Sequence, residues 1–207
     1  RRNLGVLTMR AMSLLESDQT PSTFWITNPD NVFEDNVAAG GDSFGFWINL
    51  PRHPGGFLSF QGATFRDDIF PRHAILGAFR RNVAHSYRVG VLGHDIDAKA
   101  FDKRTQVTRK RDAVTHFWYK QVDDVTPGLR RVSKLEDTLT YANSESGGIF
   151  AECSHLHIAG FTSIRQPSGL EALLFFAEQW GDDSNGWEGP MVTDALFVGT
   201  GSDGTGI

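Results

Sequence analysis

The sequence predicts an all-β protein: a right-handed parallel β-helix that forms one segment of a longer stack of coils. Three observations lead to this fold class: an internal repeat, short apolar runs separated by turn residues, and 22 Gly with 16 Phe in 207 residues. Glycine permits tight turns, and phenylalanine is enriched in strands that face a core. A chain of this length fits one domain, so we expect residues 1–207 to form a single β-helix segment.

The repeat is clearest around two asparagines. The hexapeptide Phe33–Ala38 (FEDNVA) returns as Phe79–Ala84 (FRRNVA), which places Asn36 and Asn82 46 residues apart. We interpret this spacing as two turns of a coil of roughly 20 to 25 residues, a size common among stacked repeats. Each copy is followed by a glycine and an apolar pair, and a weaker third copy lies further along. The glycines and the third asparagine are Gly45, Gly90 and Asn143.

The recurring residues have a physical role at the corners of a coil. Glycine and asparagine accept the left-handed backbone conformation of a sharp turn at the lowest cost. Asparagines at the same corner of successive coils can also hydrogen-bond to one another, while Phe33 and Phe79 are expected to point inward and stack. The imidazole of His85 can bind Ser86 or a neighbouring backbone. We therefore assign structural roles to Asn36, Asn82, Asn143, His85, Gly45 and Gly90.

Short apolar runs bounded by Gly, Pro, Asn or Asp predict the strands. The runs are Phe24–Ile26, Phe44–Ile48, Phe57–Phe60, Val114–Tyr119, Leu156–Ile158, Leu173–Phe176 and Ala195–Val198. Gly169–Trp180 shows weak helical periodicity, so a short helix or an edge segment is expected there. The same runs suit an ordinary two-sheet sandwich, which remains the alternative fold. Polar stretches near 94–112 and 180–188 predict loops that project from the stack.

Charge and composition argue against several functions. A formal net charge of -5 and a pI near 5.8 leave no basic stripe for nucleic acid. No apolar run approaches the roughly 20 residues of a membrane span, so none is expected in this segment. The single Cys153 cannot form an internal disulfide. The sequence lacks a phosphate-binding loop and a His-Glu-x-x-His element, so no catalytic residue is assigned and an enzyme is disfavoured.

One pair of carboxylates is a candidate metal site. Asp95 and Asp97 alternate along the chain, which places both side chains on one side of an extended segment. Such a pair can bind Ca²⁺ through oxygen ligands, and Ca²⁺ is the one cofactor that the sequence suggests. Two aspartates in an exposed, solvated loop are the competing interpretation.

Two further groups are candidate ligand contacts. Five cations lie within nine residues and can attract an acidic glycan or another polyanion, although flanking aspartates also suit a solvated loop. Trp180 and Trp187 lie in a stretch rich in Gly, Asp and Asn, where their rings can stack on sugars or anchor the loop. The cations are Lys103, Arg104, Arg109, Lys110 and Arg111.

The first half of the sequence carries a family likeness. Thr23–Pro29 (TFWITNP), Asn36–Gly41 and Phe44–Trp47 resemble the β-helix region of the fibrocystin and fibrocystin-like proteins. The same region is similar in the cell-migration-inducing hyaluronidase proteins, and Asn82–Ser86 is similar to a later coil of the family. The likeness is strong over residues 13–92 and weak to about residue 175.

The resemblance implies large extracellular proteins in which a β-helix is joined to other domains and often to a membrane anchor. Some members are ciliary surface proteins, and others bind and depolymerise hyaluronan. We therefore expect a structural and ligand-presenting module of an extracellular, cell-surface or ciliary-membrane protein. Its expected partners are flanking domains of the same polypeptide and an extracellular glycan or protein. The alternative is a β-helix that binds a hyaluronan-type polysaccharide or depolymerises it as a hydrolase.

The ends of the sequence bear on this expectation. A solenoid exposes its core and an unpaired strand edge at each end unless a cap covers them. Neither end of this sequence shows an amphipathic helix that can act as a cap. We therefore expect the stack to continue on both sides.

Overall fold

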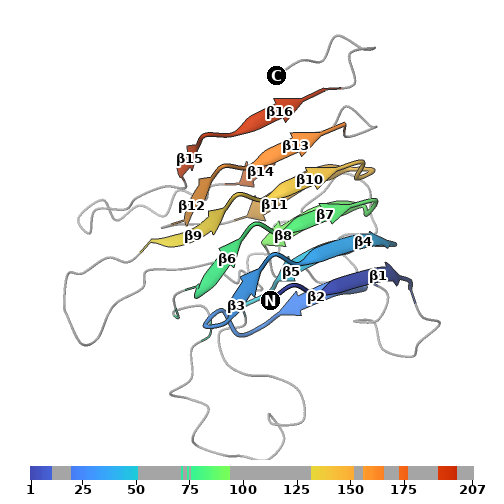
Figure 1. Cartoon of the computed structure of the whole chain (residues 1–207), viewed down its shortest axis with the longest axis horizontal. Helices are drawn as coiled ribbons and strands as arrows, with labels where there is room; N and C mark the ends of the chain where they lie inside the picture. Colours follow the sequence, from blue (N-terminus) through green and yellow to red (C-terminus); the bar gives the residue numbers. More distant parts are fainter. Residues whose placement is uncertain are drawn as a thin grey trace, which may run out of the picture.

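The computed structural model describes residues 1–10, 20–50, 71, 74, 76–93, 132–151, 156–165, 173–176 and 191–199. In this part of the chain the elements are β-strands, and every strand pair is parallel. The strands form three sheets, named here A, B and C (Figure 1). Successive strands along the chain enter sheets A, B and C in turn, so three strands make one coil.

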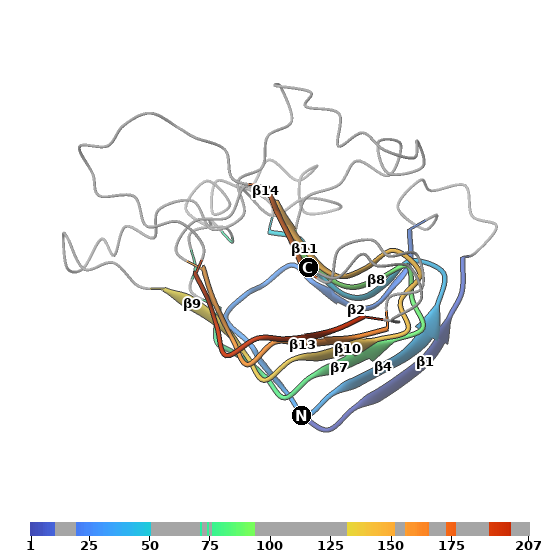
Figure 2. The same cartoon turned by 90° about the horizontal axis from the view of Figure 1, so that it is seen from above.

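Each sheet contains one strand from each coil. Sheet A has six strands: β1 (Leu4–Thr8), β4 (Val37–Gly41), β7 (Val83–His85), β10 (Leu139–Tyr141), β13 (Thr162–Ile164) and β16 (Leu196–Val198). Sheet B contains β2 (Ser22–Ile26), β5 (Phe44–Ile48), β8 (Val89–Gly93), β11 (Ser146–Ala151) and β14 (Leu173–Phe176). Sheet C contains β3 (Val32–Glu34), β6 (Ala78–Arg80), β9 (Ser133–Glu136), β12 (Leu156–Ala159) and β15 (Met191–Thr193). Seen along the stack, the strands of each sheet follow one another with a progressive offset (Figure 2). The fold is a parallel β-helix, as the sequence predicts.

The register shows that one repeat is one coil. Val37 of β4 pairs with Val83 of β7, so Asn36 and Asn82 lie in adjacent coils. The interpretation of their 46-residue spacing as two turns is therefore wrong. The spacing includes the residues between β5 and β6, which are residues 49–77. A count of residues alone does not distinguish such a long connection from an additional turn of the β-helix.

The third copy of the repeat is also displaced. Leu139 pairs with Val83, so Thr138 occupies the corner position that Asn82 has one coil earlier. Asn143 lies at the next corner, after β10. The prediction that Asn143 is equivalent to Asn82 is wrong, because the apolar residue that follows the corner sets the register of the strands.

Small side chains line the inner face of sheet A. Ala38, Ala84, Thr140 and Ser163 are almost fully buried on successive strands. Large side chains from sheets B and C fill the interior opposite them, and they form the main core cluster. Burial of one such large side chain contributes about 1.5–3 kcal/mol, so the core depends mainly on these two sheets.

Aromatic rings stack from coil to coil inside the helix. Phe24 lies face to face with Phe46, with ring centroids 4.7 Å apart, and Phe46 meets Phe79 edge-on at 5.3 Å. Phe33 contacts Phe79 at 6.4 Å in a tilted arrangement. The prediction that Phe33 and Phe79 point inward and pack together is confirmed.

Sheet B is buried on both faces in its middle strands. All five residues of β5 and all five of β8 are buried. A second apolar cluster is formed by Phe44 and Trp47 of β5, Val89 and Leu92 of β8, and Ile149 of β11. Runs buried on both faces are apolar throughout, which explains why Phe44–Ile48 is recognisable in the sequence.

Two corners of each coil use the left-handed conformation. At the corner between sheets C and A, the C–A corner, the residues with positive φ are Arg2, Asp35, Arg81, Asp137, Gly160 and Asp194. At the A–B corner they are Leu7, Gly40, Ser86, Ala142 and Arg165. Most of these residues are neither glycine nor asparagine, so the expectation that Gly and Asn occupy the left-handed positions is wrong. The stacked hydrogen bonds on both sides impose the conformation even on residues for which it is unfavourable.

The strand predictions can be compared directly with the structure. Phe44–Ile48 and Leu173–Phe176 coincide with β5 and β14, and three other runs fall within one residue or two of β2, β12 and β16. Phe57–Phe60 and Val114–Tyr119 lie outside the described residues. Within Gly169–Trp180, the described residues form β14 at the edge of sheet B. The edge-segment alternative is therefore correct for residues 173–176, and the helix is not.

Candidate functional site

The predicted ligand and metal contacts lie outside the described residues. They are Asp95, Asp97, Lys103, Arg104, Arg109, Lys110, Arg111, Trp180 and Trp187, together with the loops at 94–112 and 180–188. These assignments stay predictions. Among the residues that the structure does describe, no group of three or more His, Cys, Asp or Glu is placed to hold a metal ion.

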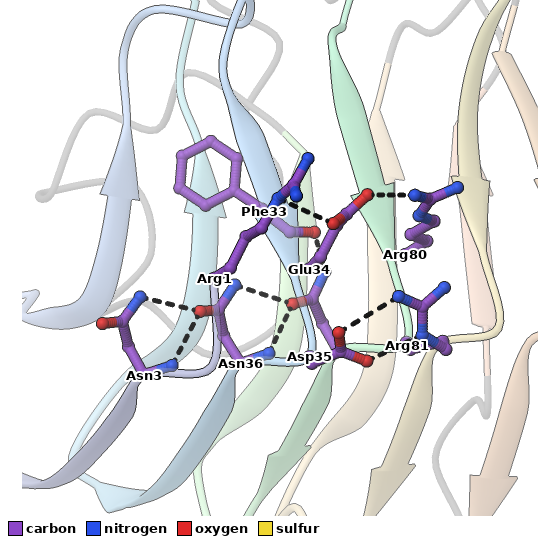
Figure 3. A network of polar contacts seen from close by, with 9 residues as sticks. Arg1, Asn3, Phe33, Glu34, Asp35, Asn36, Arg80 and Arg81 are labelled. Atoms are coloured by element: carbon purple, nitrogen blue, oxygen red, sulfur yellow. Dashed lines mark hydrogen bonds and ion pairs between the residues drawn. The ribbon is translucent and has the colours of Figure 1, made fainter.

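The densest described polar network lies at the C–A corner (Figure 3). Its central feature is a ladder of three asparagine side chains from adjacent coils. The Nδ2 of Asn3 donates to the Oδ1 of Asn36 at 2.9 Å, and the Nδ2 of Asn36 donates to the Oδ1 of Asn82 at 3.0 Å. The backbone N–H of Asn3 and that of Asn36 donate to the same two oxygens at 3.1 Å. Each side-chain oxygen therefore accepts two hydrogen bonds from the coil before it.

The ladder joins the coils at a buried position. Asn36 and Asn82 are almost fully buried, and the Nδ2 of Asn82 donates to the carbonyl of Phe33 at 2.8 Å. A buried amide that lacks partners is costly, whereas one with all of its bonds satisfied stabilises a single arrangement. The hydrogen bond between asparagines of successive coils is thus present between Asn36 and Asn82.

Charged residues alternate in sign beside this ladder. Arg1, Glu34, Arg80 and Glu136 occupy one position in four successive coils, and the next position holds Arg2, Asp35, Arg81 and Asp137. Glu34 has only 5% of its side chain exposed and lies between two guanidinium groups, those of Arg1 and Arg80. Burial of that carboxylate is tolerable because both neighbours are cations.

Asp35 and Arg81 form the best-defined ion pair of the corner. The Nε of Arg81 donates to one carboxylate oxygen of Asp35 at 2.7 Å, and its NH2 group donates to the other at 3.1 Å. This bidentate bond lowers the pKa of Asp35 below its ordinary value, and further cations nearby act in the same direction. The pair is partly exposed, so its main effect is to fix geometry.

The chemistry of the corner suits stacking between coils. The carboxylates of Glu34 and Asp35 are each committed to arginine, which leaves neither available as an acid, a base or a metal ligand. The bonds run from one coil to the next, and their sign alternates along the stack. The corner therefore fixes which residue of one coil lies beside which residue of the next.

A second polar group lies at the A–B corner. The Oδ1 of Asn143 accepts the backbone N–H of Tyr87 at 3.1 Å, and its Nδ2 donates to the carbonyl of Ala84 at 3.4 Å. Asn82 makes the same pair of bonds to the coil before it, to residues 36 and 33. Asn143 is thus a structural residue at a different corner from the one expected.

The phenol of Tyr87 crosses two coils at this corner. Tyr87 is buried, and its hydroxyl group shares hydrogen bonds with the hydroxyl of Thr23, which also contacts that of Thr8. Burial raises the pKa of Tyr87. The ring passes over Gly41, where a Cβ would lie 2.5 Å from Cε1 of Tyr87, so this position requires glycine. Neither Gly41 nor the hydroxyl group of Thr8 was identified from the sequence.

Gly45 and Gly90 are needed for close packing, and not for a turn. A Cβ on Gly45 would lie 2.7 Å from the carbonyl oxygen of Gly90, and one on Gly90 would lie 2.6 Å from that of Gly147. Neither residue has a positive φ. The expectation of a left-handed corner at these two glycines is wrong, because both lie within strands where sheet B approaches sheet A.

His85 lies on the outer face of sheet A. Its Nδ1 is 3.1 Å from the Oγ of Ser86, and its ring stacks on Tyr141 of the next coil at 4.4 Å. The contact with Ser86 is one of the two that the sequence suggests. The stacking on Tyr141 is a packing interaction between coils.

Exposed apolar side chains gather at the two ends of the stack. Among the described residues, the exposed large hydrophobic side chains are Leu4, Val6, Leu7, Met9, Trp25 and Val32 at one end and Met191, Val192, Leu196 and Val198 at the other. The coils between them contribute none to this set. Trp25 is 56% exposed although it stacks on Trp47, which is 5% exposed one coil further in. The ends are therefore apolar surfaces bordered by strands that, within the described residues, pair on one side only.

None of the described residues belongs to a helix with the length and apolar character of a membrane span.

The fold and these corners define the class of protein, a parallel β-helix module held in register by polar ladders. Residues 6–91 match the family model described as the CEMIP β-helix. Over 95% of its length the chain is 42% identical to Fibrocystin-L of Mus musculus. The recognition of a β-helix region common to fibrocystin-like and hyaluronidase proteins is confirmed.

Two further relatives extend this comparison. Fibrocystin-L of Homo sapiens is 39% identical over 84 residues, which is 41% of the chain. The cell surface hyaluronidase CEMIP2 of Homo sapiens is 25% identical over 183 residues, which is 86% of the chain. The chain spans only 4% of mouse Fibrocystin-L, 2% of human Fibrocystin-L and 12% of CEMIP2. These relatives are thus far longer than the segment that they share with it.

Proposed function

We propose that the chain is a structural and ligand-presenting module of a large extracellular or cell-surface protein, with the ciliary membrane as one such surface. The observation that carries this proposal is that, among the described residues, the exposed large apolar side chains lie in the strands at the two ends of the stack. A module with apolar surfaces at both ends is suited to lie between neighbouring parts of a longer polypeptide. The length of its relatives supports this arrangement.

In this proposal the stacked sheets keep flanking domains apart, and the residues between strands contact the partner. The basic cluster from Lys103 to Arg111 attracts an acidic glycan or an acidic protein surface, and Trp180 and Trp187 provide rings for stacking. Asp95 and Asp97 bind Ca²⁺ in this proposal.

The test uses the full-length protein with an epitope tag next to this segment. Antibody staining of intact, unpermeabilised cells is expected to detect the tag. Replacement of the five cations from Lys103 to Arg111 by serine should abolish binding of heparin-type polyanions and leave surface staining unchanged. Staining that requires permeabilised cells would contradict the proposed location, and unchanged polyanion binding would contradict the proposed contact.

The second candidate function is binding or depolymerisation of a hyaluronan-type polysaccharide. Similarity to a relative named as a cell surface hyaluronidase favours it, as does 35% identity over 88 residues to the human cell migration-inducing and hyaluronan-binding protein. Incubation of the full-length protein with long hyaluronan, with and without Ca²⁺, separates the candidates. Shortening of the polysaccharide would contradict the structural module and support a hydrolase. Binding without shortening would support the structural module and identify hyaluronan as its ligand.

A further inference from the structure

The free edge of β1 presents polar groups that are paired in every later coil that the structure describes. The N–H groups of Val37, Val83, Leu139, Thr162 and Leu196 donate to the corner carbonyl of the preceding coil at 2.8–2.9 Å. Leu4 holds the equivalent position in the first coil, so its N–H points to the unpaired edge. The Oδ1 of Asn3 faces the same edge. The equivalent oxygens of Asn36 and Asn82 each accept hydrogen bonds from the asparagine of the preceding coil.

The residues at this edge repeat a corner found inside the stack. Arg1-Arg2-Asn3 has the same sequence as Arg80-Arg81-Asn82, and the two triplets are two coils apart at the same corner. The backbones also agree, since φ is 59° at Arg2 and 54° at Arg81. The two triplets therefore place the same residue types at the same corner, with the same left-handed backbone at the middle residue.

The interior copy shows what this triplet binds. Arg80 pairs with Glu34, Arg81 forms its bidentate bond with Asp35, and Asn82 accepts two hydrogen bonds from Asn36. All three partners belong to the coil that comes before. The triplet Arg-Arg-Asn is thus matched to Glu-Asp-Asn on its N-terminal side.

We infer that the edge formed by β1, β2 and β3 is a docking surface for another parallel β-coil, whose C–A corner carries two acidic residues followed by asparagine. The acidic residues pair with Arg1 and Arg2, and the asparagine donates its N–H and Nδ2 to the Oδ1 of Asn3. The carbonyl of that asparagine accepts the N–H of Leu4. The same coil covers Leu4, Val6 and the open face of Trp25 with apolar side chains.

The charge pattern distinguishes this occupant from a second copy of the chain. The opposite end of the stack presents Thr193, Asp194 and Ala195 at the same corner. That edge offers one carboxylate for two arginines and no side-chain amide for Asn3. A coil of the type Glu34-Asp35-Asn36 supplies all three groups.

The inference rests on the proposed function only in placing the module within a longer stack, and it is tested without cells. A second copy of residues 32–79 is fused in front of Arg1 of the whole chain. In the native sequence this segment precedes Arg80-Arg81-Asn82, so the junction Phe-Arg-Arg-Asn is preserved. Amide hydrogen exchange is then measured for Leu4–Thr8.

The fused coil is expected to slow exchange of the Leu4 amide by on the order of tenfold or more relative to the unfused chain. Asp35→Arg in the fused copy should remove this protection, because it opposes Arg2. Asp42→Arg in the copy is the matched control, since it makes the same charge change away from the C–A corner and should retain the protection.

Two outcomes would overturn the inference: no slowing in the fusion, or equal loss with Asp35→Arg and Asp42→Arg. Association of the unfused chain into head-to-tail assemblies that Asp194→Arg dissolves would also overturn it, because the occupant would then be a second copy. Absence of the full-length protein from the cell surface would overturn the proposed function and leave these exchange results unaffected.

Discussion

The side chain of Asn82 holds both the backbone N–H and the Nδ2 of Asn36 on a single oxygen atom, at 3.1 and 3.0 Å. Its own Nδ2 reaches the carbonyl of Phe33 in the same neighbouring coil, at 2.8 Å. One buried amide therefore satisfies three polar groups that belong to another turn of the chain, which joins coils that are distant in sequence.

Replacement of the Asn82 side chain by alanine should destabilise the folded protein. Asn82→Ala leaves the N–H of Asn36 and the carbonyl of Phe33 without their bonds, so the free energy of unfolding should fall by about 2–3 kcal/mol. Urea denaturation followed by far-ultraviolet circular dichroism measures the change. Asn28→Ala is the matched control, because Asn28 is exposed and bonds only within its own turn. Equal losses in the two variants would show that the ladder adds no stability.

A methyl group at Gly90 should disturb the contact between sheets A and B. The added Cβ would lie 2.6 Å from a backbone oxygen and 2.9 Å from the Cγ2 of Thr140, so the backbone must move. We expect Gly90→Ala to lower the free energy of unfolding by about 1–3 kcal/mol. Gly199→Ala is the control, since nothing lies within 4 Å of the added atom. A Gly90 variant as stable as the Gly199 variant would contradict this packing.

One substitution should stabilise the protein. The hydroxyl group of Thr140 is buried in the inner face of sheet A and has no hydrogen-bond partner. Thr140→Val keeps the shape and removes the unpaired group, so the unfolding midpoint in urea should rise, by about 1 kcal/mol in free energy. Thr138→Val, which deletes a hydroxyl that reaches the carbonyl of Glu136, should give no gain. A loss of stability in the Thr140 variant would indicate that its hydroxyl is satisfied.

Alkaline conditions should weaken the A–B corner through Tyr87. Burial raises the pKa of Tyr87 in the folded state, so its contribution is complete below the ordinary tyrosine pKa of about 10 and is lost as pH rises above that value. Urea midpoints measured upward from neutral pH should fall for the native chain. Tyr87→Phe should be less stable at neutral pH, by about 1 kcal/mol, and should lack this part of the alkaline decline. Tyr141→Phe should retain it, and identical alkaline profiles for the native chain and Tyr87→Phe would exclude the effect.

Acidic conditions should weaken the C–A corner through the ion pair of Asp35 and Arg81. Arg81 lowers the pKa of Asp35 in the folded state, so the stability from this pair is present above the ordinary carboxyl range and is lost as pH falls through the lowered pKa. A titration followed by the carboxyl carbon resonance of Asp35 measures the pKa directly. Arg81→Gln should raise it toward the ordinary value, whereas Arg165→Gln, at the other corner, should leave it unchanged. An unchanged pKa of Asp35 in the Arg81→Gln variant would contradict the ion pair.

The sequence predicted the parts of the fold that single residues determine. Phe44–Ile48 is apolar at nearly every position because both of its faces are buried, so it is recognisable as β5. The similarity of Phe33–Ala38 to Phe79–Ala84 correctly identified an inward phenylalanine and a stacked asparagine. These features repeat because adjacent coils provide the same environment to both copies.

The features that depend on stacking between coils could not be predicted from the sequence. The left-handed conformation at Arg81 is imposed by the neighbouring coils and is not a preference of arginine. The strands of sheet A are as short as three residues and have small inner residues, so they lack a distinct apolar run. The alternation of charge beside the asparagine ladder becomes visible only when the coils are aligned by pairing Val37 with Val83.

Because each repeat is one coil, axial height in this module is independent of chain length. The coil from Val83 to Leu139 uses more than twice as many residues as the coil from Leu139 to Thr162, yet each adds one strand spacing of about 4.8 Å. The six strands of sheet A thus rise by about 24 Å whatever lies between them. Insertions between sheets can enlarge the girth and the available binding surface, while the separation of the two ends stays the same.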